Sequence, residues 1–305
     1  MGKGVRVLVP ATTANLGAGF DCLGMALNLY NVFDFELGSE GFTAAGEGEE
    51  SLRASSGRLI YRAWQAAYEY RNQAVPPVKI NLKSNIPIGR GLGSSATAII
   101  AGLFAANYLG ELALDDQELL LLATEIEGHP DNVAPALLGG LVVTANGDGD
   151  GQRPALHYVV LEPPGELQAV LAVPAFELST AKARSVLPKN VSRQDAVFNV
   201  GRAALLVAAW SSRRWDLLGK AMEDRLHQPM RAALVPGLTQ VLEAAEGAGA
   251  LGAALSGAGP SVIALTLEEQ AAAVSEAMER AFSAHGIDCK IIRTTPARQG
   301  AYLAD

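Results

Sequence analysis

Cysteine is scarce in this sequence. Cys22 and Cys289 are the two cysteines among 305 residues, and they lie near opposite ends of the chain. They form neither a disulfide framework nor a metal-ligand spacing, which is typical of a protein from a reducing compartment. The apolar stretch at residues 5–9 is too short for the core of a signal peptide, and no cleavage pattern comes after it. The sequence therefore predicts a cytoplasmic protein.

Long hydrophobic runs are missing as well. The longest apolar stretches span residues 96–109 and 133–145, and each is interrupted by glycine or asparagine. A helix needs about 20 apolar residues to cross a bilayer. We therefore expect no membrane span and no membrane partner.

Positive charge is in deficit. Lysine and arginine number 24 against 32 aspartates and glutamates, so the net charge is −8 and the isoelectric point is near 5.1. This balance argues against a nucleic acid or an anionic membrane as the main partner. The four histidines have no mutual spacing that is typical of a zinc site. We expect a small-molecule partner and no nucleic acid.

Apolar residues, by contrast, are abundant. They make up 49% of the chain while charged residues make up 18%, a composition typical of a globular protein. Single cores usually stop growing beyond about 250–300 residues, so this length favours two domains. A Pro/Gly cluster at residues 162–165 predicts their boundary. The expected domains are residues 1–162 and 163–305.

Hydrophobic periodicity predicts an α+β chain. In the first half the expected strands are residues 5–9, 31–37 and 78–83, and the expected helices are residues 59–70, 96–109 and 115–127. Pro10 ends the first strand, a polar loop comes after it, and residues 38–58 form a connection. In the second half the expected helices are residues 193–211, 215–226, 236–246 and 267–285, and the expected strands are residues 168–173, 253–255, 261–265 and 289–294.

The turn at residues 87–95 carries the most informative pattern. Gly89, Gly91 and Gly93 let the backbone adopt positive φ and approach a ligand closely, and a helix is expected directly after them. Backbone N–H groups followed by a helix N-terminus bind phosphate. Ser94 and Ser95 are placed to cap that helix or to reach a phosphate or Mg²⁺. Neither the P-loop pattern nor Gly-x-Gly-x-x-Gly fits, and a turn that uses glycine only for geometry is the alternative.

A polar cluster lies further along the chain, at Glu127, His129, Asp131 and Asn132. Magnesium prefers hard oxygen ligands, typically one or two carboxylates together with substrate phosphates. Glu127 or Asp131 is therefore a candidate ligand. The alternative is purely structural, with a helix that ends near residue 128 and Asp131 or Asn132 capping the next segment.

Other polar residues are candidates for ligand binding; they are Asn15, Asp21, Thr180, Arg184 and Arg231. The first two lie in a glycine-spaced loop, where such residues also satisfy turn backbones. Arginine suits bidentate recognition of a carboxylate, although these two arginines also fit an ordinary surface. Residues 255–261 form a small-residue turn that either approaches a ligand or closes a tight hairpin. They lack the Gly-x-Ser-x-Gly pattern of a serine hydrolase.

Together these segments resemble the GHMP small-molecule kinases. Residues 10–21, Pro-Ala-Thr-Thr-Ala-Asn-Leu-Gly-Ala-Gly-Phe-Asp, resemble the first motif of that family. Residues 87–96 resemble its phosphate loop, and residues 255–261 resemble its third motif. Residues 127–140, 178–184 and 228–231 are similar to the branch of the family that acts on homoserine. The blocks occur in the family's order, so the resemblance covers essentially the whole chain.

The resemblance implies a fold and a reaction. The fold is the two-domain α+β GHMP kinase architecture, with an N-terminal domain resembling ribosomal protein S5 domain 2 and a ferredoxin-like C-terminal domain that completes the substrate cleft. The reaction is ATP-dependent transfer of the γ-phosphoryl group to the side-chain hydroxyl of L-homoserine, giving O-phospho-L-homoserine for threonine biosynthesis. ATP and Mg²⁺ are the implied cofactors. A homodimer is an implied possibility because many relatives are dimers.

The resemblance also implies roles for individual residues. The ATP-binding loop comprises Pro87, Ile88, Gly89, Arg90, Gly91, Leu92, Gly93, Ser94, Ser95, Ala96 and Thr97. Ser95 and Glu127 hold Mg²⁺. The homoserine pocket comprises Asn15, Asp21, His129, Asn132, Arg184, Arg231 and Gly257, with Asp21 toward the ammonium and the arginines toward the carboxylate. Asp131 and Thr180 are the catalytic candidates, and we expect Asp131 to orient the site without being indispensable as a base.

One position departs from the family pattern, and two alternatives stay open. Arg58 stands where the family usually carries an asparagine near the adenine. The alternatives are a kinase for another small alcohol, such as mevalonate, and a non-catalytic ligand sensor on the same fold. A sensor is expected to have lost its loop glycines or its metal ligands. Ser95, Glu127 and the loop glycines are all present, which favours an active enzyme.

Overall fold

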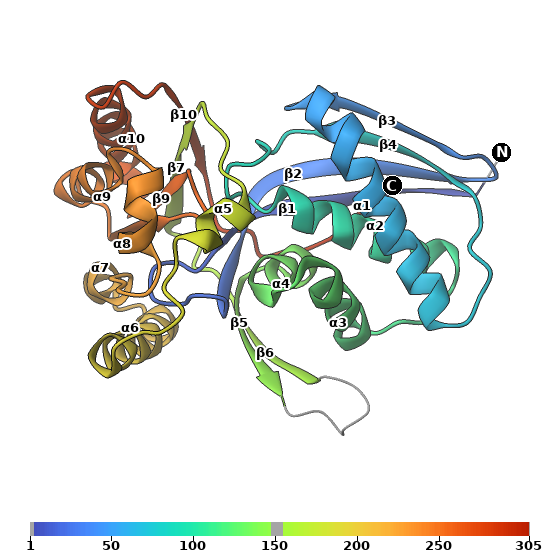
Figure 1. Cartoon of the computed structure of the whole chain (residues 1–305), viewed down its shortest axis with the longest axis horizontal. Coiled ribbons are helices and arrows are strands. Elements are labelled where there is room, and N and C mark those ends of the chain that lie inside the picture. The colour runs from blue at the N-terminus through green and yellow to red at the C-terminus, as the bar shows by residue number, and fades with distance from the viewer. Residues whose placement is uncertain (1–2, 148–154, 305) are drawn as a thin grey trace.

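The computed structural model describes residues 3–147 and 155–304, which form two β-sheets (Figure 1). The larger sheet has seven strands. Its main path runs β11 (Tyr302–Ala304), β1 (Gly4–Ala14), β2 (Leu23–Leu37), β4 (Val78–Ser84) and β3 (Gly41–Gly46), while β5 (Leu141–Gly147) and β6 (Ala155–Leu161) join at the beginning of β2. Because β11 pairs with β1, the C-terminal residues return to the sheet built by the first half of the chain.

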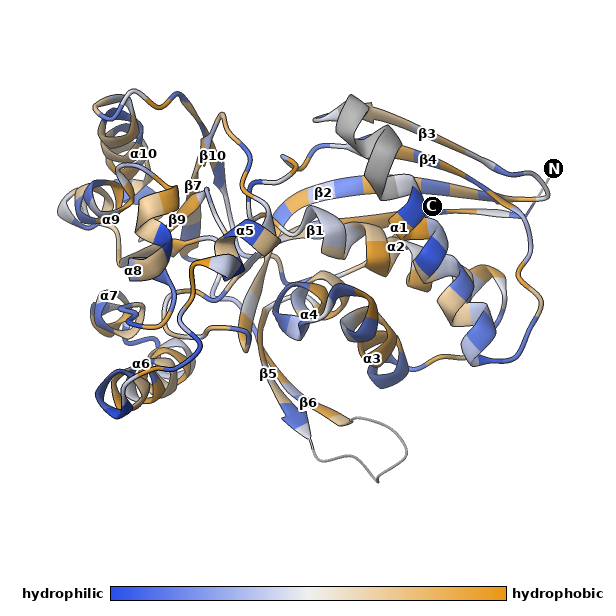
Figure 2. Cartoon of the chain, in the orientation of Figure 1, coloured by the Kyte–Doolittle hydropathy of each residue, from blue (hydrophilic) through white to orange (hydrophobic). Residues whose placement is uncertain are grey.

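Four helices cover one face of this sheet; they are α1 (Glu49–Tyr70), α2 (Ser94–Leu109), α3 (Asp116–Glu127) and α4 (Pro130–Leu138). Alternate residues of β2, Phe33 and Phe35, point into the core, and the Phe35 ring stacks on Trp64 of α1 at 5.9 Å between centroids. Figure 2 shows α2 as mostly hydrophobic, whereas α1 and α3 carry hydrophilic residues. A helix that is apolar on nearly all sides lies inside the fold, and α2 does so between the sheet and its neighbouring helices.

The smaller sheet has the ferredoxin-like order. Its four antiparallel strands run β10 (Cys289–Thr294), β7 (Leu167–Pro174), β9 (Val262–Leu267) and β8 (Gly252–Leu255), which is the order 4-1-3-2 along the chain. One face packs against α9 (Leu238–Gly247) and α10 (Glu268–Ser283). The other face packs against α6 (Arg193–Ser212) and α7 (Leu218–Ala221). The expected α+β class is therefore confirmed.

The two halves of the chain share an apolar cluster. Leu23 and Met25 of β2 belong to the same buried cluster as Leu171 of β7 and Leu206 of α6. Contacts across this cluster join the larger sheet to the smaller one. They hold the segments that line the cleft in fixed relative positions.

The expected elements of the first half are confirmed, but several boundaries were wrong. The strand expected at residues 31–37 begins at Leu23. Pro10 does not end the first strand, because β1 continues to Ala14 through a register shift between Pro10 and Ala11. Such an irregularity tolerates proline, which cannot donate to the strand ladder. Residues 38–58 are not a simple connection, since they contain β3 and the beginning of α1. A short strand paired in parallel with β4 has too little periodicity to be found in the sequence.

The single helix expected at residues 215–226 is also wrong. A 3-10 turn at Trp215–Leu217 leads into α7, which ends at Ala221. The carboxylate of Asp224 then accepts hydrogen bonds from the backbone N–H groups of Leu226, His227 and Gln228 at 2.7–3.0 Å. These bonds replace a helical pattern, and α8 (Gln228–Arg231) begins after them. Among the described residues, no helix has the length and hydropathy of a membrane span.

Candidate active site

A cavity of about 300 Å³ opens between the two halves of the chain. Eighteen of the residues predicted for the site line it: Asn15, Asp21, residues 88–95, Glu127, His129, Asp131, Asn132, Thr180, Arg184, Arg231 and Gly257. Leu59, Leu178, Ser179 and Ala258 also line it and were not predicted. Pro87, Ala96 and Thr97 lie outside its lining, and Ala96 and Thr97 are fully buried behind it. Segments far apart in the sequence thus meet at one place.

The carbonyls of the glycine loop are bonded away from the cavity. The Leu92 carbonyl accepts a hydrogen bond from the Thr12 N–H at 3.1 Å, and the Gly91 carbonyl accepts one from the Ser256 hydroxyl at 2.7 Å. The Gly89 carbonyl accepts a further bond at 3.0 Å from the Leu178 N–H. These bonds attach the loop to β1, to the β8–β9 turn and to the segment before α5 (Thr180–Ser185). The loop is therefore held rigidly from behind.

The glycines of this loop are required by its conformation. Gly89, Gly91 and Gly93 have φ values of +63°, +73° and +69°. A Cβ at Gly93 would lie 1.9 Å from the Thr12 hydroxyl oxygen, and one at Gly91 would lie 2.1 Å from the Ser256 carbonyl oxygen. Within the described part of the chain, no acceptor pairs with the backbone N–H groups of residues 89–95. These donors and the beginning of α2 form a cradle suited to phosphate.

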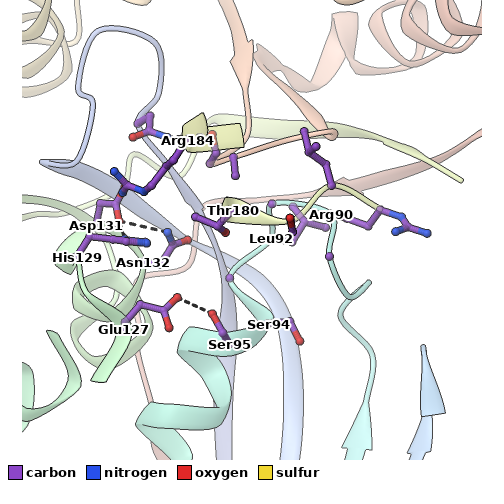
Figure 3. Close-up of a pocket in the computed structure, with 18 of the residues that line it drawn as sticks. Arg90, Leu92, Ser94, Ser95, Glu127, His129, Asp131, Asn132, Thr180 and Arg184 are labelled. Atoms are coloured by element: carbon purple, nitrogen blue, oxygen red, sulfur yellow. Dashed lines mark hydrogen bonds and ion pairs between the residues drawn. The ribbon is translucent and has the colours of Figure 1, made fainter. Parts of the chain in front are cut away.

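The serines after the loop do not cap the helix, so that prediction was wrong. Gly93 is the N-cap of α2 and Ser94 is the first helical residue. The Ser95 hydroxyl instead donates a 2.5 Å hydrogen bond to Glu127 Oε1, and Figure 3 shows the two side chains facing each other. A positive φ at Gly128 ends α3 directly after Glu127, as expected. Burial raises the pKa of the Glu127 carboxyl, and the charge of Asp131 adds to this effect.

Ser95 and Glu127 offer oxygen donors of the kind that Mg²⁺ prefers. Both offer hard oxygen atoms, and both line the cavity next to the phosphate cradle. The described residues contain no group of three or more His, Cys, Asp or Glu side chains placed to enclose a metal. Mg²⁺ usually keeps waters and substrate phosphates as ligands, so a partial protein site of this kind fits it.

The polar cluster continues at the beginning of α4. His129 is its N-cap with Pro130 as the first helical residue, so neither Asp131 nor Asn132 is the cap. Nδ1 of His129 lies 2.5 Å from Asp131 Oδ1, and Asn132 Nδ2 donates to the same oxygen at 3.3 Å. Burial acts to lower the pKa of His129, but the hydrogen bond and charge of Asp131 raise it overall. Figure 3 shows these three side chains together on the wall beside Glu127.

Asp21 and Arg184 form an ion pair at the cavity wall. Two guanidinium nitrogens of Arg184 donate to the two carboxylate oxygens of Asp21 at 2.7 and 3.0 Å, and each side chain is a little over one-third exposed. This pairing raises the pKa of Arg184. Asn15 holds the loop, because its side chain accepts from the Asp21 N–H and donates to the Gly257 carbonyl. Thr180, the first residue of α5, lies exposed on the same side of the cavity.

Arg231 lies in the floor of the site with a set of residues that the sequence analysis missed. Its side chain is 1% exposed, and burial together with the charge of Arg184 lowers its pKa to about 10. His227 and Phe20 contact it, and Asp224 lies behind His227. The available signal was an aspartate shortly before a helical turn, because such a side chain accepts the first N–H groups of the turn. His227 and Arg231 are four residues apart, a spacing that brings side chains together at such a turn.

Comparisons with known proteins agree with this architecture. The model described as "GHMP kinases N terminal domain" matches residues 58–140, and that described as "GHMP kinases C terminal" matches residues 203–284. The chain belongs to the GHMP kinase family.

Similar proteins place the chain more finely within the family. A homoserine kinase of Carboxydothermus hydrogenoformans is 46% identical over 303 residues, covering 97% of this chain and 96% of the relative. A homoserine kinase of Synechococcus is 47% identical, covering 98% and 97%. The crystal structure of homoserine kinase from Cytophaga hutchinsonii has a TM-score of 0.87 at 33% identity, covering 100% and 98%. L. major mevalonate kinase, at 18% identity and a TM-score of 0.73, shares the fold.

Proposed function

We propose that this protein is an ATP-dependent kinase that phosphorylates the side-chain hydroxyl of L-homoserine. The observation that carries the proposal is one cavity in which a phosphate cradle faces a pocket with both a carboxylate and guanidinium groups. Curated relatives that are similar over nearly their whole length are homoserine kinases. We also infer that the protein acts in the cytoplasm and that its N-terminal domain, residues 1–162, carries the nucleotide site.

In this proposal the glycine loop holds the triphosphate of ATP. The free N–H groups of residues 89–95 donate to phosphate oxygens, and the N-terminus of α2 adds a partial positive charge. Phosphoryl transfer depends mainly on positioning and on charge neutralisation, so a rigid cradle supplies much of what the reaction needs. Ser95 and Glu127 hold Mg²⁺, which neutralises developing charge on the phosphate oxygens.

Binding of the substrate replaces the ion pair between Asp21 and Arg184 with two ion pairs between the protein and the substrate. Asp21 and Arg184 satisfy each other in the structure, and each is accessible from the cavity. An amino acid brings an ammonium group for Asp21 and a carboxylate for Arg184 and Arg231. A ligand with only one of these charges would leave a protein charge without its partner, which costs free energy. The pair therefore favours zwitterionic substrates over mevalonate, which has no ammonium group.

Asp131 orients the reacting groups in this proposal. Its Oδ1 is already engaged by His129 and Asn132, and the side chain is only 2% exposed. Asn132 in turn accepts a hydrogen bond from the Thr12 hydroxyl at 2.9 Å. Thr180 lines the same cavity from α5, and its hydroxyl contacts the substrate or the transferred phosphoryl group in this proposal.

The direct test is release of ADP by the purified protein with Mg²⁺-ATP and, separately, L-homoserine, L-serine, L-threonine and mevalonate. Mass spectrometry of the product identifies the acceptor. We expect selective formation of O-phospho-L-homoserine. Turnover with mevalonate alone would overturn the substrate, and ATP binding with no turnover on any acceptor would overturn the enzymatic function.

A further inference from the structure

His227 lies at the centre of a buried network beneath the substrate pocket. Its side chain is fully buried, with Nε2 lying 2.8 Å from the Gly17 carbonyl oxygen and Nδ1 lying 3.2 Å from Nη1 of Arg231. The imidazole stacks on Phe20 at 5.1 Å between ring centroids. It therefore has a defined partner on each of its two nitrogens and on one ring face.

These partners fix the tautomer of the imidazole. A carbonyl oxygen only accepts hydrogen bonds, so Nε2 carries the proton that is donated to Gly17. A guanidinium only donates, so Nδ1 must present its lone pair to Arg231. His227 is accordingly neutral and acts as a donor on one side and an acceptor on the other. Burial lowers the pKa of His227 and outweighs the charge of Asp224, which acts to raise it, while the charge of Arg231 lowers it as well. The overall direction agrees with a neutral imidazole.

A second buried side chain holds the imidazole in place. The Asp224 carboxylate is fully buried and accepts hydrogen bonds from the Asn199 side chain and from the N–H groups of His227 and Gln228. This carboxylate fixes the backbone that carries His227. It also lies 3.6 Å from Nε2, where its charge favours the orientation that points the N–H toward it and toward Gly17.

Arg231 is left with a limited set of free donors. Its Nε donates to the Ala183 carbonyl at 3.3 Å, and Nη1 donates to the Gly257 carbonyl at 3.0 Å as well as to His227. Nη2 has no partner among the residues that the structure describes. Because Arg231 lines the cavity, Nη2 is the group that it offers to a bound carboxylate.

We propose that His227 is a positioning residue that holds Arg231 in the orientation that binds the carboxylate of the amino-acid substrate. The inference rests on the proposed function. His227 also ties Arg231 to the loop that contains Gly17 and Asp21. One imidazole thereby fixes the distance between the guanidinium that receives the carboxylate and the aspartate that receives the ammonium. His227 in this way contributes to specificity for an α-amino acid without touching it.

The test separates positioning from a merely structural role. His227→Phe keeps the ring and the stacking on Phe20 but removes both hydrogen bonds. We expect the KM for L-homoserine to rise about 10- to 100-fold, since hydrogen bonds to charged groups are involved. The KM for ATP and the kcat should change less than about threefold, because the phosphate cradle is not connected to His227 except through the pocket floor. His227→Gln retains a donor and an acceptor, and it should recover most of the lost affinity.

Two further comparisons show whether the effect passes through Arg231. In an Arg231→Gln background, His227→Phe should add little to the KM for homoserine, because the group that it positions is gone. With 2-aminobutane-1,4-diol, which has the hydroxyl and the amine but no carboxylate, His227→Phe should leave the KM unchanged. Met230→Ala, an exposed neighbour outside the cavity lining, is the control and should behave as the unmodified protein.

Several results would overturn the inference. Equal increases in the KM values for homoserine and ATP would indicate a general structural role, and additive effects with Arg231→Gln would indicate independent action. If His227→Phe does not fold, ¹⁵N NMR of the unmodified protein decides. We expect an unprotonated Nδ1 whose resonance shifts on addition of homoserine, and no such shift would contradict the inference. Failure of the unmodified protein to phosphorylate homoserine would overturn the proposed function instead.

Discussion

At the scale of a single residue, substitution of Asp131 tests how the acceptor hydroxyl is activated. Its buried Oδ1 is held by His129 and Asn132, which favours an orienting role over that of a mobile base. We expect Asp131→Asn to lower kcat by about tenfold or less, whereas loss of a general base costs about 10²- to 10⁴-fold. Single-turnover phosphorylation at saturating ATP and homoserine measures this step. A decrease of three orders of magnitude would establish proton abstraction by Asp131.

Gly93 tests the phosphate cradle with a matched control. Gly93 and Gly286 share a φ of +69°, but a Cβ at Gly93 would collide with Thr12 while one at Gly286 meets nothing within 4 Å. Both alanine variants bear a left-handed backbone cost of about 1–2 kcal/mol. In addition, we expect Gly93→Ala, but not Gly286→Ala, to raise the KM for ATP by at least about tenfold, because the loop at residue 93 must move. Equal KM values in the two variants would show that the loop does not bind the nucleotide.

His227 gives stability a specific dependence on pH. Its pKa is lower in the folded protein than its usual value of 6.5, so the unfolded chain binds the proton more readily. The stabilising contribution is therefore complete above pH 6.5 and decreases as the pH falls below that value. Asp224, whose pKa is lowered, stays ionised throughout, and Asp21 and Arg231 are the other charged groups that act on the ring.

Urea unfolding of the unmodified protein and of His227→Phe between pH 5 and pH 8 measures this dependence. We expect the unmodified protein to exceed His227→Phe in its free energy of unfolding by a constant amount above about pH 6.5. This difference should become smaller as the pH falls toward 5, because the unmodified protein loses stability there. A difference that is independent of pH would contradict the buried neutral state of the imidazole.

Residues that were proposed for the site from a contiguous motif lie close together in the structure. Residues 88–95 and the cluster from Glu127 to Asn132 line one cavity, as a local pattern of glycine and carboxylate suggests. The mutual pairing of Asp21 with Arg184 was not predictable, because it joins positions 163 residues apart. The buried role of His227 was hidden for the same reason. Its partners Gly17 and Phe20 come from the opposite half of the sequence.

At the scale of an element, the two ends of α3 have different roles, one in stability and the other at the site. Asp115 caps this helix in a reciprocal arrangement with Glu118, whereas Glu127 at the other end faces the cavity. We expect Asp115→Ala to lower the free energy of unfolding by about 1 kcal/mol, since a capping side chain is lost. The kcat and both KM values should stay unchanged, because the last turn is fixed by its contacts with the site. Chemical denaturation and steady-state kinetics of the same sample test both parts, and a raised KM for ATP would contradict the separation.

Elements with strong periodicity were predicted, and those set by tertiary contacts were not. The helices α2, α3 and α10 carry long apolar patterns that the sequence displays directly. The short strand β11 forms because it pairs with β1, which lies at the opposite end of the sequence. The end of α7 is likewise set by hydrogen bonds to Asp224 and not by any helix-breaking residue at that point.

At the scale of the whole molecule, the shared apolar cluster predicts cooperative unfolding. Trp64 lies in the core of the larger sheet, and Trp210 lies in the cluster that joins the two halves. With Trp64 as the only tryptophan, after Trp210→Phe and Trp215→Phe, fluorescence reports the first half. With Trp64→Phe it reports the second. We expect the two transition curves in urea to coincide once the stability change of each variant is corrected by far-UV circular dichroism.

Separate transitions would show that the halves unfold independently and that the shared cluster adds little. The division at residues 162 and 163 remains a prediction about domain organisation. The change of sheet between β6 and β7 falls at this place, while β11 crosses back to the first sheet. Composition and a Pro/Gly cluster indicate where a chain turns. They do not reveal that a buried core will connect the parts.

The central claim is that one cavity places a nucleotide phosphate on the glycine loop and an amino acid between Asp21 and the two arginines. A crystal structure with Mg²⁺, a non-hydrolysable ATP analogue and L-homoserine tests it most directly. We predict phosphate oxygens within hydrogen-bond distance of the N–H groups of residues 91–95, Mg²⁺ on Ser95 and Glu127, and the homoserine carboxylate on Arg184 and Arg231, with its hydroxyl facing the γ-phosphate. A nucleotide bound away from this loop, or homoserine bound with its carboxylate away from both arginines, would contradict the claim.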